Sequence, residues 1–282
     1  MVDVKQSIIA AGGRYIQLPQ YKGGQGNTWG NLTIPSPYEI ESSQSYPIGT
    51  LFVCGEDRYR YVQAGNTCTA GRLLVGYNAF GTATSGDGTT RETGTIAAAA
   101  TDGDTTITCT DQGSATPANV FAGGFATIYW EFLVRRIESN TKEDSGGEFV
   151  LTLSDPIDQA IDAASVVSCY RDIFADVRYL TSGVQALHGS GCCVSIKTIT
   201  DAYYGWGQTG GIAGIAGTDN VGAGDDEIGL YNLSGAVYFR SGVHASNNYP
   251  TYQYVGYIAG YTGHTGEDFP GALIPVKLCL GE

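Results

Sequence analysis

Charged residues and methionine are scarce in this sequence. Charged side chains account for 15% of the 282 residues, and methionine occurs once. Proteins rich in helix draw on Ala, Leu, Glu, Lys and Met, because these residues lose little freedom when they enter a helix. The shortage of charged helix formers and of methionine therefore argues against a mainly helical fold.

Basic residues are few as well. The 15 Lys and Arg are outnumbered by 28 Asp and Glu, the net charge is −13, and the basic residues form no cluster along the sequence. A nucleic-acid-binding protein needs a basic surface to displace counterions from phosphates. The composition therefore excludes direct nucleic-acid binding, while an acidic surface supports solubility and complements a basic partner.

Long apolar runs are missing too. No run approaches the roughly 20 residues that a membrane-spanning helix needs. The start at Met1 shows no basic segment followed by an apolar one, as a secretion signal would. We therefore expect no membrane association and a protein made in a reducing cytoplasm. The seven cysteines are odd in number, and in that compartment we expect free, buried thiols.

Glycine and tyrosine, in contrast, are abundant, with 41 and 19 occurrences. Glycine supplies the positive φ values that tight turns require. The hydrophobic fraction of 42% is too high for a disordered chain. Together these features predict a folded all-β protein, a β-sandwich or barrel of many short strands.

Short strand-like segments recur along the chain. Residues 58–63 alternate charged or polar side chains with aromatic or apolar ones, the period of two typical of a half-buried strand. The segment from Asp155 to Ala164 predicts the one short helix, because Pro156 suits a first turn and two isoleucines follow four residues apart. Further strands are expected at 50–54, 72–75, 105–110, 126–134, 148–153, 166–170, 192–196, 203–208, 228–230, 236–240, 252–258 and 272–280.

The patterns divide the chain into three parts. Residues 1–47 hold Gly-rich and Pro-rich stretches without sustained periodicity, so they predict an extended N-terminal arm, ordered only where it lies on something else. Residues 48–180 are expected to form a β domain. Residues 181–282 form either a second β domain or a continuation of the first, since the strand pattern weakens around 172–190.

No convergent catalytic set appears among the reactive residues. The three histidines stand singly, whereas a metal site needs several ligands. The stretch Gly205-Trp206-Gly207-Gln208-Thr209-Gly210 has the spacing of a dinucleotide-binding loop, but a poor helix former follows where that site requires a helix. Cys192 and Cys193 are neighbours whose side chains would point to opposite faces of a strand. We therefore predict no enzyme activity and no cofactor.

One acidic stretch is a candidate for calcium. Residues from Asp219 to Glu227 include several carboxylates, and calcium prefers oxygen ligands. The stretch lacks the ordered ligand spacing of a calcium-binding loop, so a solvated turn is the favoured interpretation and no metal site is predicted.

The tyrosines indicate protein–protein contact. Tyrosine brings a large contact area with a polar tip, so it is enriched at interfaces, although sheet packing also uses it heavily. Together with the unusual N-terminal arm, the clustering favours interface use. The candidate interface residues are Tyr15, Tyr21, Trp29, Tyr38, Tyr203, Tyr204, Trp206, Tyr252 and Tyr254.

Several motifs resemble one family. The order of segments 46–50 (Tyr-Pro-Ile-Gly-Thr), 58–65 (Arg-Tyr-Arg-Tyr-Val-Gln-Ala-Gly) and 70–74 (Ala-Gly-Arg-Leu-Leu) is similar to the opening of tailed-bacteriophage virion structural proteins. The threonine-rich stretch 105–109 leading to 119–124, and the aromatic stretch 201–211, also resemble that family. The chain departs from it in its abundant cysteine and in residues 172–190.

This resemblance implies a head-associated structural role, as a capsid decoration or cement protein within the virion, assembled in the host cytoplasm. The implied partners are the major capsid protein and further copies of the chain in a homotrimer. Two alternatives remain open: a tail, fibre or extracellular-filament subunit that stacks by strand addition, and a glycan-binding module with exposed tyrosines and Trp206 as stacking platforms.

Overall fold

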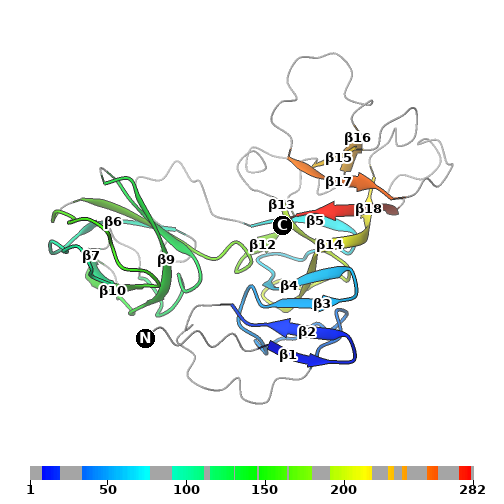
Figure 1. The fold of residues 1–282 in the computed structure, drawn as a ribbon, viewed down its shortest axis with the longest axis horizontal. Helices are drawn as coiled ribbons and strands as arrows, with labels where there is room; N and C mark the ends of the chain where they lie inside the picture. Colours follow the sequence, from blue (N-terminus) through cyan, green and yellow to red (C-terminus); the bar gives the residue numbers. More distant parts are fainter. Residues whose placement is uncertain are drawn as a thin grey trace, which may run out of the picture. The chain divides into compact units, whose positions relative to one another are not determined.

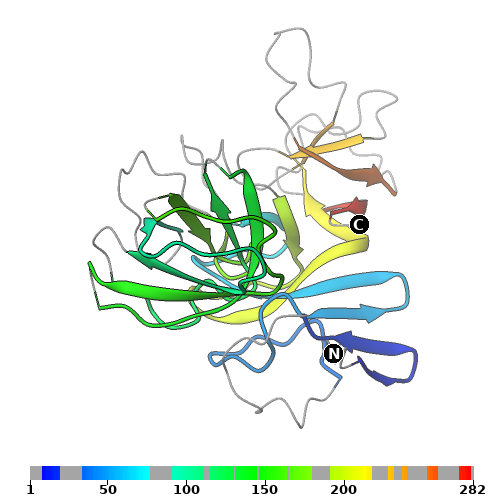
Figure 2. The same cartoon turned by 60° about the vertical axis from the view of Figure 1, so that its left-hand side comes forward.

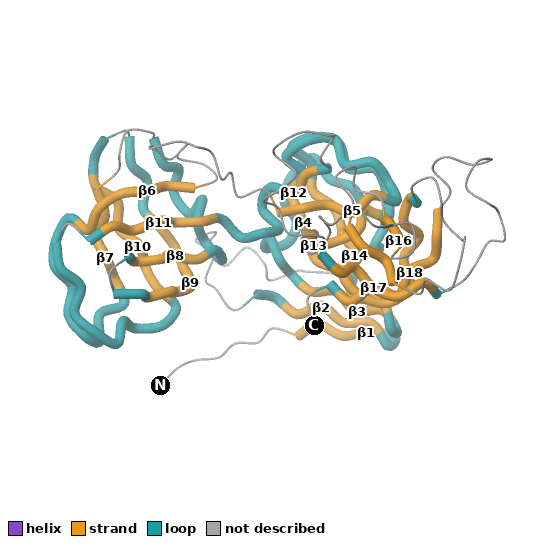
Figure 3. The backbone as a smooth tube through the Cα atoms, turned by 90° about the horizontal axis from the view of Figure 1, so that it is seen from above, coloured by secondary structure: helices purple, strands orange, loops and turns teal. Residues whose placement is uncertain are grey.

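The computed structural model describes residues 8–19, 34–76, 91–110, 115–129, 131–144, 146–163, 165–179, 191–217, 228–231, 237–239, 253–259 and 273–280. These residues form eighteen strands, and no helix occurs among them (Figure 1, Figure 3). The predicted all-β fold is therefore confirmed.

The chain divides into two compact units, with one inserted into the other. A barrel unit is formed mainly by residues 78–176, and a sheet unit mainly by residues 32–77 and 177–282. The strands that flank the insertion, β5 (Arg72–Gly76) and β12 (Val177–Arg178), pair antiparallel with Gly76 opposite Val177. The chain therefore leaves and re-enters the sheet unit at neighbouring points. This division differs from the expected boundaries after residues 47 and 180, because strand patterns run through both units and do not mark where an insertion begins or ends.

The barrel unit is a closed antiparallel barrel of six strands in the order β10-β7-β6-β11-β8-β9. Closure leaves no strand of the barrel with an unpaired edge. The strands are β6 (Arg91–Ile96), β7 (Thr106–Thr110), β8 (Phe125–Ile128), β9 (Leu133–Asn140), β10 (Glu148–Leu153) and β11 (Val166–Tyr170).

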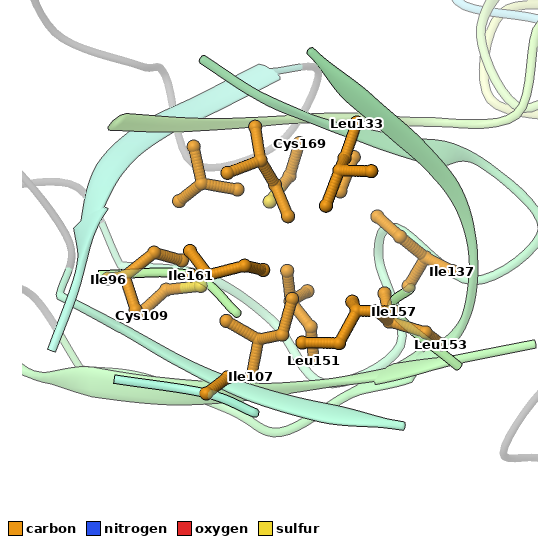
Figure 4. Packing of buried hydrophobic residues seen from close by; sticks show 14 of the residues in the cluster. Ile96, Ile107, Cys109, Leu133, Ile137, Leu151, Leu153, Ile157, Ile161 and Cys169 are labelled. Atoms are coloured by element: carbon orange, nitrogen blue, oxygen red, sulfur yellow. The ribbon is translucent and has the colours of Figure 1, made fainter. Parts of the chain in front are cut away.

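Alternating side chains fill the barrel interior. Along β10, Phe149, Leu151 and Leu153 are buried, while the residues between them are partly exposed. Side chains from the surrounding strands point toward one another inside the barrel (Figure 4). This period of two, visible in the sequence, explains why β10 begins and ends where it was predicted, whereas β11 is buried along most of its length.

The helix predicted from Asp155 to Ala164 is wrong. Residues 155–163 are irregular, and their two isoleucines enter the barrel core. The Ile157 amide donates to the Asp104 carbonyl at 2.9 Å, and the Ile161 amide donates to the Ala100 carbonyl at 2.9 Å. These amides bond across to another segment, so a spacing of four residues here reflects an extended chain that closes over the core.

The sheet unit is built around β14 (Tyr204–Ala216), a strand of 13 residues that curves through the unit (Figure 2). Its first half pairs with β4 (Asp57–Gln63), and its second half pairs with β18 (Leu273–Cys279). The main path of the sheet runs β1-β2-β3-β4-β14-β18-β17-β15-β16, and β13 joins β14 to β5. The remaining strands are β3 (Leu51–Cys54), β13 (Gly191–Ser195), β15 (Ile228–Tyr231), β16 (Val237–Phe239) and β17 (Tyr254–Ile258).

The expected N-terminal arm is partly a regular element of the sheet. β1 (Ile8–Ala11) and β2 (Arg14–Gln17) form a hairpin, and β2 pairs antiparallel with β3. Both strands are only four residues long, which is too short for a periodic pattern to register in the sequence. Residues 34–47 add no strand, but the Tyr46 side chain is buried in the sheet unit.

Close packing explains the glycines of β14. A Cβ at Gly207 would collide with the buried side chain of Cys193 on the neighbouring strand. Gly211 has a φ of 82°, in the left-handed region that favours glycine. The stretch 205–210 lies within β14, and β14 continues to Ala216 with no helix after Gly210. Its resemblance to a dinucleotide-binding loop therefore has a packing origin.

Candidate interaction surface

An exposed, largely apolar surface covers one face of β14, β18 and β17. In the register of these strands, Ile212 lies opposite Lys277, and Lys277 lies opposite Tyr257. The exposed fractions of Ile212, Tyr257 and Leu273 are 56%, 50% and 57%. We call Ile212, Tyr257, Leu273 and Lys277 the interaction face.

The opposite face of the same strands belongs to the core. Ala213, Ile215, Ile274, Val276 and Leu278 alternate with the exposed positions and are all buried. The alternation fixes which side chains face outward, because a register shift by one residue would exchange the two sets. The interaction face is therefore held on strands anchored by a packed core.

The composition of this face is unusual for an exposed sheet surface. A single exposed apolar residue needs no explanation, but several on adjacent strands form a patch of the kind that marks an interaction site. Gly214 is also exposed and carries no side chain, and its neighbour across the strands is Pro275. Lys277 supplies the one charge of these strand positions, so the face is apolar and weakly basic.

The predicted interface residue Tyr254 lies beside this face. Its ring packs edge-to-face against Tyr257, with 5.5 Å between ring centroids. Ile212, Leu273 and Lys277 were not predicted as interface residues. The alternation in residues 273–279 indicates an outward-facing set, but the sequence does not show that β18 pairs with β14, some sixty residues earlier.

Another group of predicted residues surrounds the start of β14. Tyr203 is 38% exposed and Tyr38 is 61% exposed. The Lys197 ammonium donates to the Tyr38 carbonyl at 3.0 Å, and the amides of Glu41 and Tyr204 each donate to the other's carbonyl. The segment carrying Tyr38 is thus bonded to the strand that follows Tyr203, and these two rings remain candidate contacts.

Trp206 does not belong to any surface. Its side chain is 2% exposed and lies within 5.5 Å, between ring centroids, of Tyr46, Phe52 and Tyr61. Tyr61 is also buried, and burial raises the pKa of its hydroxyl, which donates to Glu41 at 2.8 Å. Trp206 is thus a core residue, and it is unavailable to stack on a glycan.

The other predicted residues are placed only in part. Tyr15 on β2 is partly exposed. Tyr21, Trp29 and Tyr252 lie outside the described residues, and so do the acidic stretch 219–227 and the three histidines.

The buried cysteines are poorly suited to chemistry. Burial raises the pKa of Cys109 to about 12. A register shift between Gly191 and Cys193 places the Cys192 and Cys193 sulfurs 3.8 Å apart, both buried, so the expected opposite orientation is wrong. The hydrogen bond between Cys192 and Cys193, together with burial, raises the pKa of Cys193 well above its usual range. Such thiols stay protonated at neutral pH and are weak nucleophiles and weak metal ligands.

The described part of the chain contains neither a metal-binding group of side chains nor a membrane-spanning helix. No group of three or more His, Cys, Asp or Glu side chains in it is arranged to hold a metal ion. None of its segments is a helix of the length and apolar character needed to cross a membrane. No family model, no curated protein and no solved structure matches this chain.

Proposed function

We propose that this chain is a virion structural protein of the capsid decoration or cement type, which stabilises the head through protein–protein contacts. The observation that carries the proposal is the interaction face, an exposed apolar sheet surface on strands whose opposite side is packed into a core. Its partners in this proposal are the major capsid protein and other copies of the chain in a homotrimer.

The size of the interaction face suits repeated contacts better than a solitary one. Neighbouring strands lie about 4.8 Å apart and rise about 3.3 Å per residue, so three short strands offer on the order of 300 Å². A stable pairwise interface needs about 800 Å² per partner. A contact of this size therefore gains strength when it is repeated by the symmetry of a shell, where linked contacts bind with avidity.

The sequence resemblance and the composition agree with this role. The segments 58–65 and 201–211, which resemble phage virion proteins, form β4 and the start of β14 at the centre of the sheet unit. These segments pack in the core of the sheet unit. Their resemblance to phage virion proteins therefore concerns the strands that support the interaction face. The virion location itself is part of the proposal.

A co-sedimentation experiment tests this proposal. Shells assembled from the major capsid protein alone are mixed with the wild-type chain or with Ile212→Asp, which replaces an apolar side chain of the face by a charged one. We expect the wild type to co-sediment and Ile212→Asp to bind at least about tenfold more weakly, as for a buried anchor residue. Ile173→Asp, at a 42% exposed isoleucine of the barrel unit, is the matched control and should bind like the wild type.

Either of two results would overturn the proposal. One is a wild-type chain that does not co-sediment with shells. The other is binding by Ile212→Asp that equals binding by the control variant, because the face would then play no part in the contact.

One observation favours a tail or filament subunit as a second candidate. β1 ends the main path of the sheet and pairs only with β2 among the described strands, and its sequence Ile-Ile-Ala-Ala carries no charge. An uncharged edge strand is a template for adding a strand from another chain. Electron microscopy of the purified chain separates the candidates: a filament subunit polymerises alone, whereas a decoration protein does not.

A further inference from the structure

The tip of the β8–β9 hairpin, on the barrel unit, presents an aromatic side chain to solvent. Phe132 is 94% exposed, and Tyr129 and Val134 beside it are 48% and 59% exposed. Ile128 pairs with Leu133, and both are buried, so Tyr129 and Phe132 occupy the next outward positions of the hairpin. We call Tyr129, Phe132 and Val134 the hairpin tip.

The backbone at this tip is strained and firmly held. Phe132 has a φ of 54°, in the left-handed region, which is an outlier for a bulky residue. Such a conformation costs about 1–3 kcal/mol and persists only where the surroundings impose it. Here the Gln159 amide donates to the Glu131 carbonyl at 2.8 Å, and the Ser165 hydroxyl donates to the Glu131 carboxylate at 2.6 Å. The backbone next to the ring is therefore held by the neighbouring segment before any partner arrives.

A segment with three aspartates packs against the hairpin. Arg135 on β9 donates to the Pro156 carbonyl at 3.2 Å and pairs with Asp158 at 2.6 Å, so segment 155–162 lies against the hairpin. Asp155, Asp158 and Asp162 on that segment are exposed, Asp158 with its charge partly balanced by Arg135.

The whole barrel unit is also strongly acidic. Residues 78–176 contain 15 Asp and Glu against 5 Lys and Arg, a net charge of −10, whereas the other 183 residues hold 13 against 10, a net charge of −3. A partner that reaches the hairpin tip therefore meets an apolar anchor in a negative field.

We propose that the hairpin tip docks into an apolar pocket on a basic protein surface. Complementary charge speeds the encounter and rejects acidic partners, and a preformed aromatic anchor supplies the binding energy at the centre. Lysine or arginine around such a pocket would also interact favourably with the aromatic ring. The barrel unit of a second copy is disfavoured as the partner, because two units of net charge −10 repel each other. This inference concerns a different surface from the interaction face and does not depend on the virion role.

A sensor surface carrying a dense layer of short peptides tests the proposal. The probe peptide has lysines on both sides of a Leu-Leu pair. One control peptide has glutamates in place of the lysines, and another has Ser-Ser in place of Leu-Leu. The full chain is applied as wild type, as Phe132→Ala and as Ile212→Ala, which removes an equally apolar exposed side chain from the sheet unit.

We expect the wild type to bind the Lys/Leu layer and to bind it more weakly as salt increases. Phe132→Ala should lose about tenfold in affinity, while Ile212→Ala should bind like the wild type. Three results would each overturn the proposal: no binding to the Lys/Leu layer, equal binding to the Glu/Leu layer, or equal binding by Phe132→Ala. The outcome is separate from shell co-sedimentation, so failure of one experiment leaves the other proposal standing.

Discussion

The two units of this protein differ in whether they leave strand edges unpaired. The barrel unit closes six strands on themselves and buries one set of side chains inside. The sheet unit has an open path that ends at β1 and β16 among the described strands, and it exposes an apolar face on β14, β18 and β17. Its residues outside 78–176 are nearly balanced in charge, whereas those of the barrel unit carry −10.

This difference separates two modes of association. A closed, acidic barrel leaves no strand edge unpaired, so its apolar contacts come from exposed side chains such as Phe132. An open and nearly neutral sheet gains more from being covered, because its apolar face and unpaired edges attract other chains. We therefore expect the sheet unit to provide contact area and the barrel unit to provide charge and selectivity.

The largest expected effect comes from emptying the core of one unit only. Trp206→Ala removes the central ring of the sheet unit's aromatic cluster, and we expect it to lower the free energy of unfolding of that unit by about 3–5 kcal/mol. Phe149→Ala is the matched change in the barrel unit, where the side chain is 1% exposed. Calorimetry should show two transitions, each variant lowering a different one. A single transition that both variants shift equally would mean that the units do not unfold separately.

The next largest effect is a loss of stability of the barrel unit at alkaline pH. Burial raises the pKa of Cys109 to about 12, above the value of the same thiol in the unfolded chain. The folded state thus holds this proton more tightly than the unfolded chain does. The contribution of the protonated thiol to the free energy of unfolding is therefore complete below about pH 9, and it is lost as the pH rises toward 12. The loss is on the order of 4 kcal/mol.

Denaturant unfolding at several pH values measures this effect. The stability of the barrel unit should fall between pH 9 and 12 in the wild type and fall less in Cys109→Ala. Parallel curves for the two proteins would show that the Cys109 thiol does not titrate as proposed.

A smaller effect is expected from adding one methyl group to β14. Gly207→Ala places a Cβ against buried Cys193, and overpacking of this kind costs about 1–3 kcal/mol. Gly214→Ala on the same strand meets only Leu273 atoms at 3.6 Å or more, so it should cost under about 1 kcal/mol, the intrinsic strand preference between these residues. Denaturant midpoints of the two variants compare them directly. Equal midpoints would contradict the close packing of β14 against β13.

The smallest effect is expected from surface charge on the barrel unit. Arg135 is 17% exposed in its side chain and pairs with Asp158 at 2.6 Å, so Arg135→Gln should cost about 1 kcal/mol. Lys142 pairs with Asp144, and both side chains are largely exposed, so Lys142→Gln should leave the stability unchanged within measurement. Thermal unfolding in low and high salt checks both. A larger cost for Lys142→Gln than for Arg135→Gln would reverse the expected order.

Local patterns predicted most strands well, either from an alternation of buried and exposed residues, as in β10, or from a short apolar run, as in β5 and β11. Segments 148–153 and 166–170 match β10 and β11, and the all-β class followed from composition. Segment 126–134 was predicted as one strand, but it holds the end of β8, a turn and the start of β9. The turn contains no Gly, Asn or Asp, the residues that usually mark a turn in a sequence. The positive φ is instead adopted by Phe132.

The sequence did not predict which residues meet through pairing of strands that are distant in the chain. The interaction face unites β14 and β18, which are distant in the chain, so only the observed register groups Ile212 with Lys277. The burial of Trp206 was missed for the same reason, because its neighbours Tyr46, Phe52 and Tyr61 come from segments at least 140 residues earlier. The abundance of aromatic residues alone did not separate an interface from a core.

The central claim is that the interaction face is covered by protein when the chain is in place on a virion, and lysine footprinting tests it most directly. Lys277 lies at the centre of that face and is exposed, while Lys142 lies on the barrel unit with a 65% exposed side chain. An amine-reactive reagent is applied to the free chain and to intact particles, and mass spectrometry measures modification at both lysines. We predict that Lys277 becomes at least about tenfold less reactive in particles while Lys142 keeps most of its reactivity. Equal labelling of Lys277 in both states, or particles that do not contain the chain, would contradict the claim.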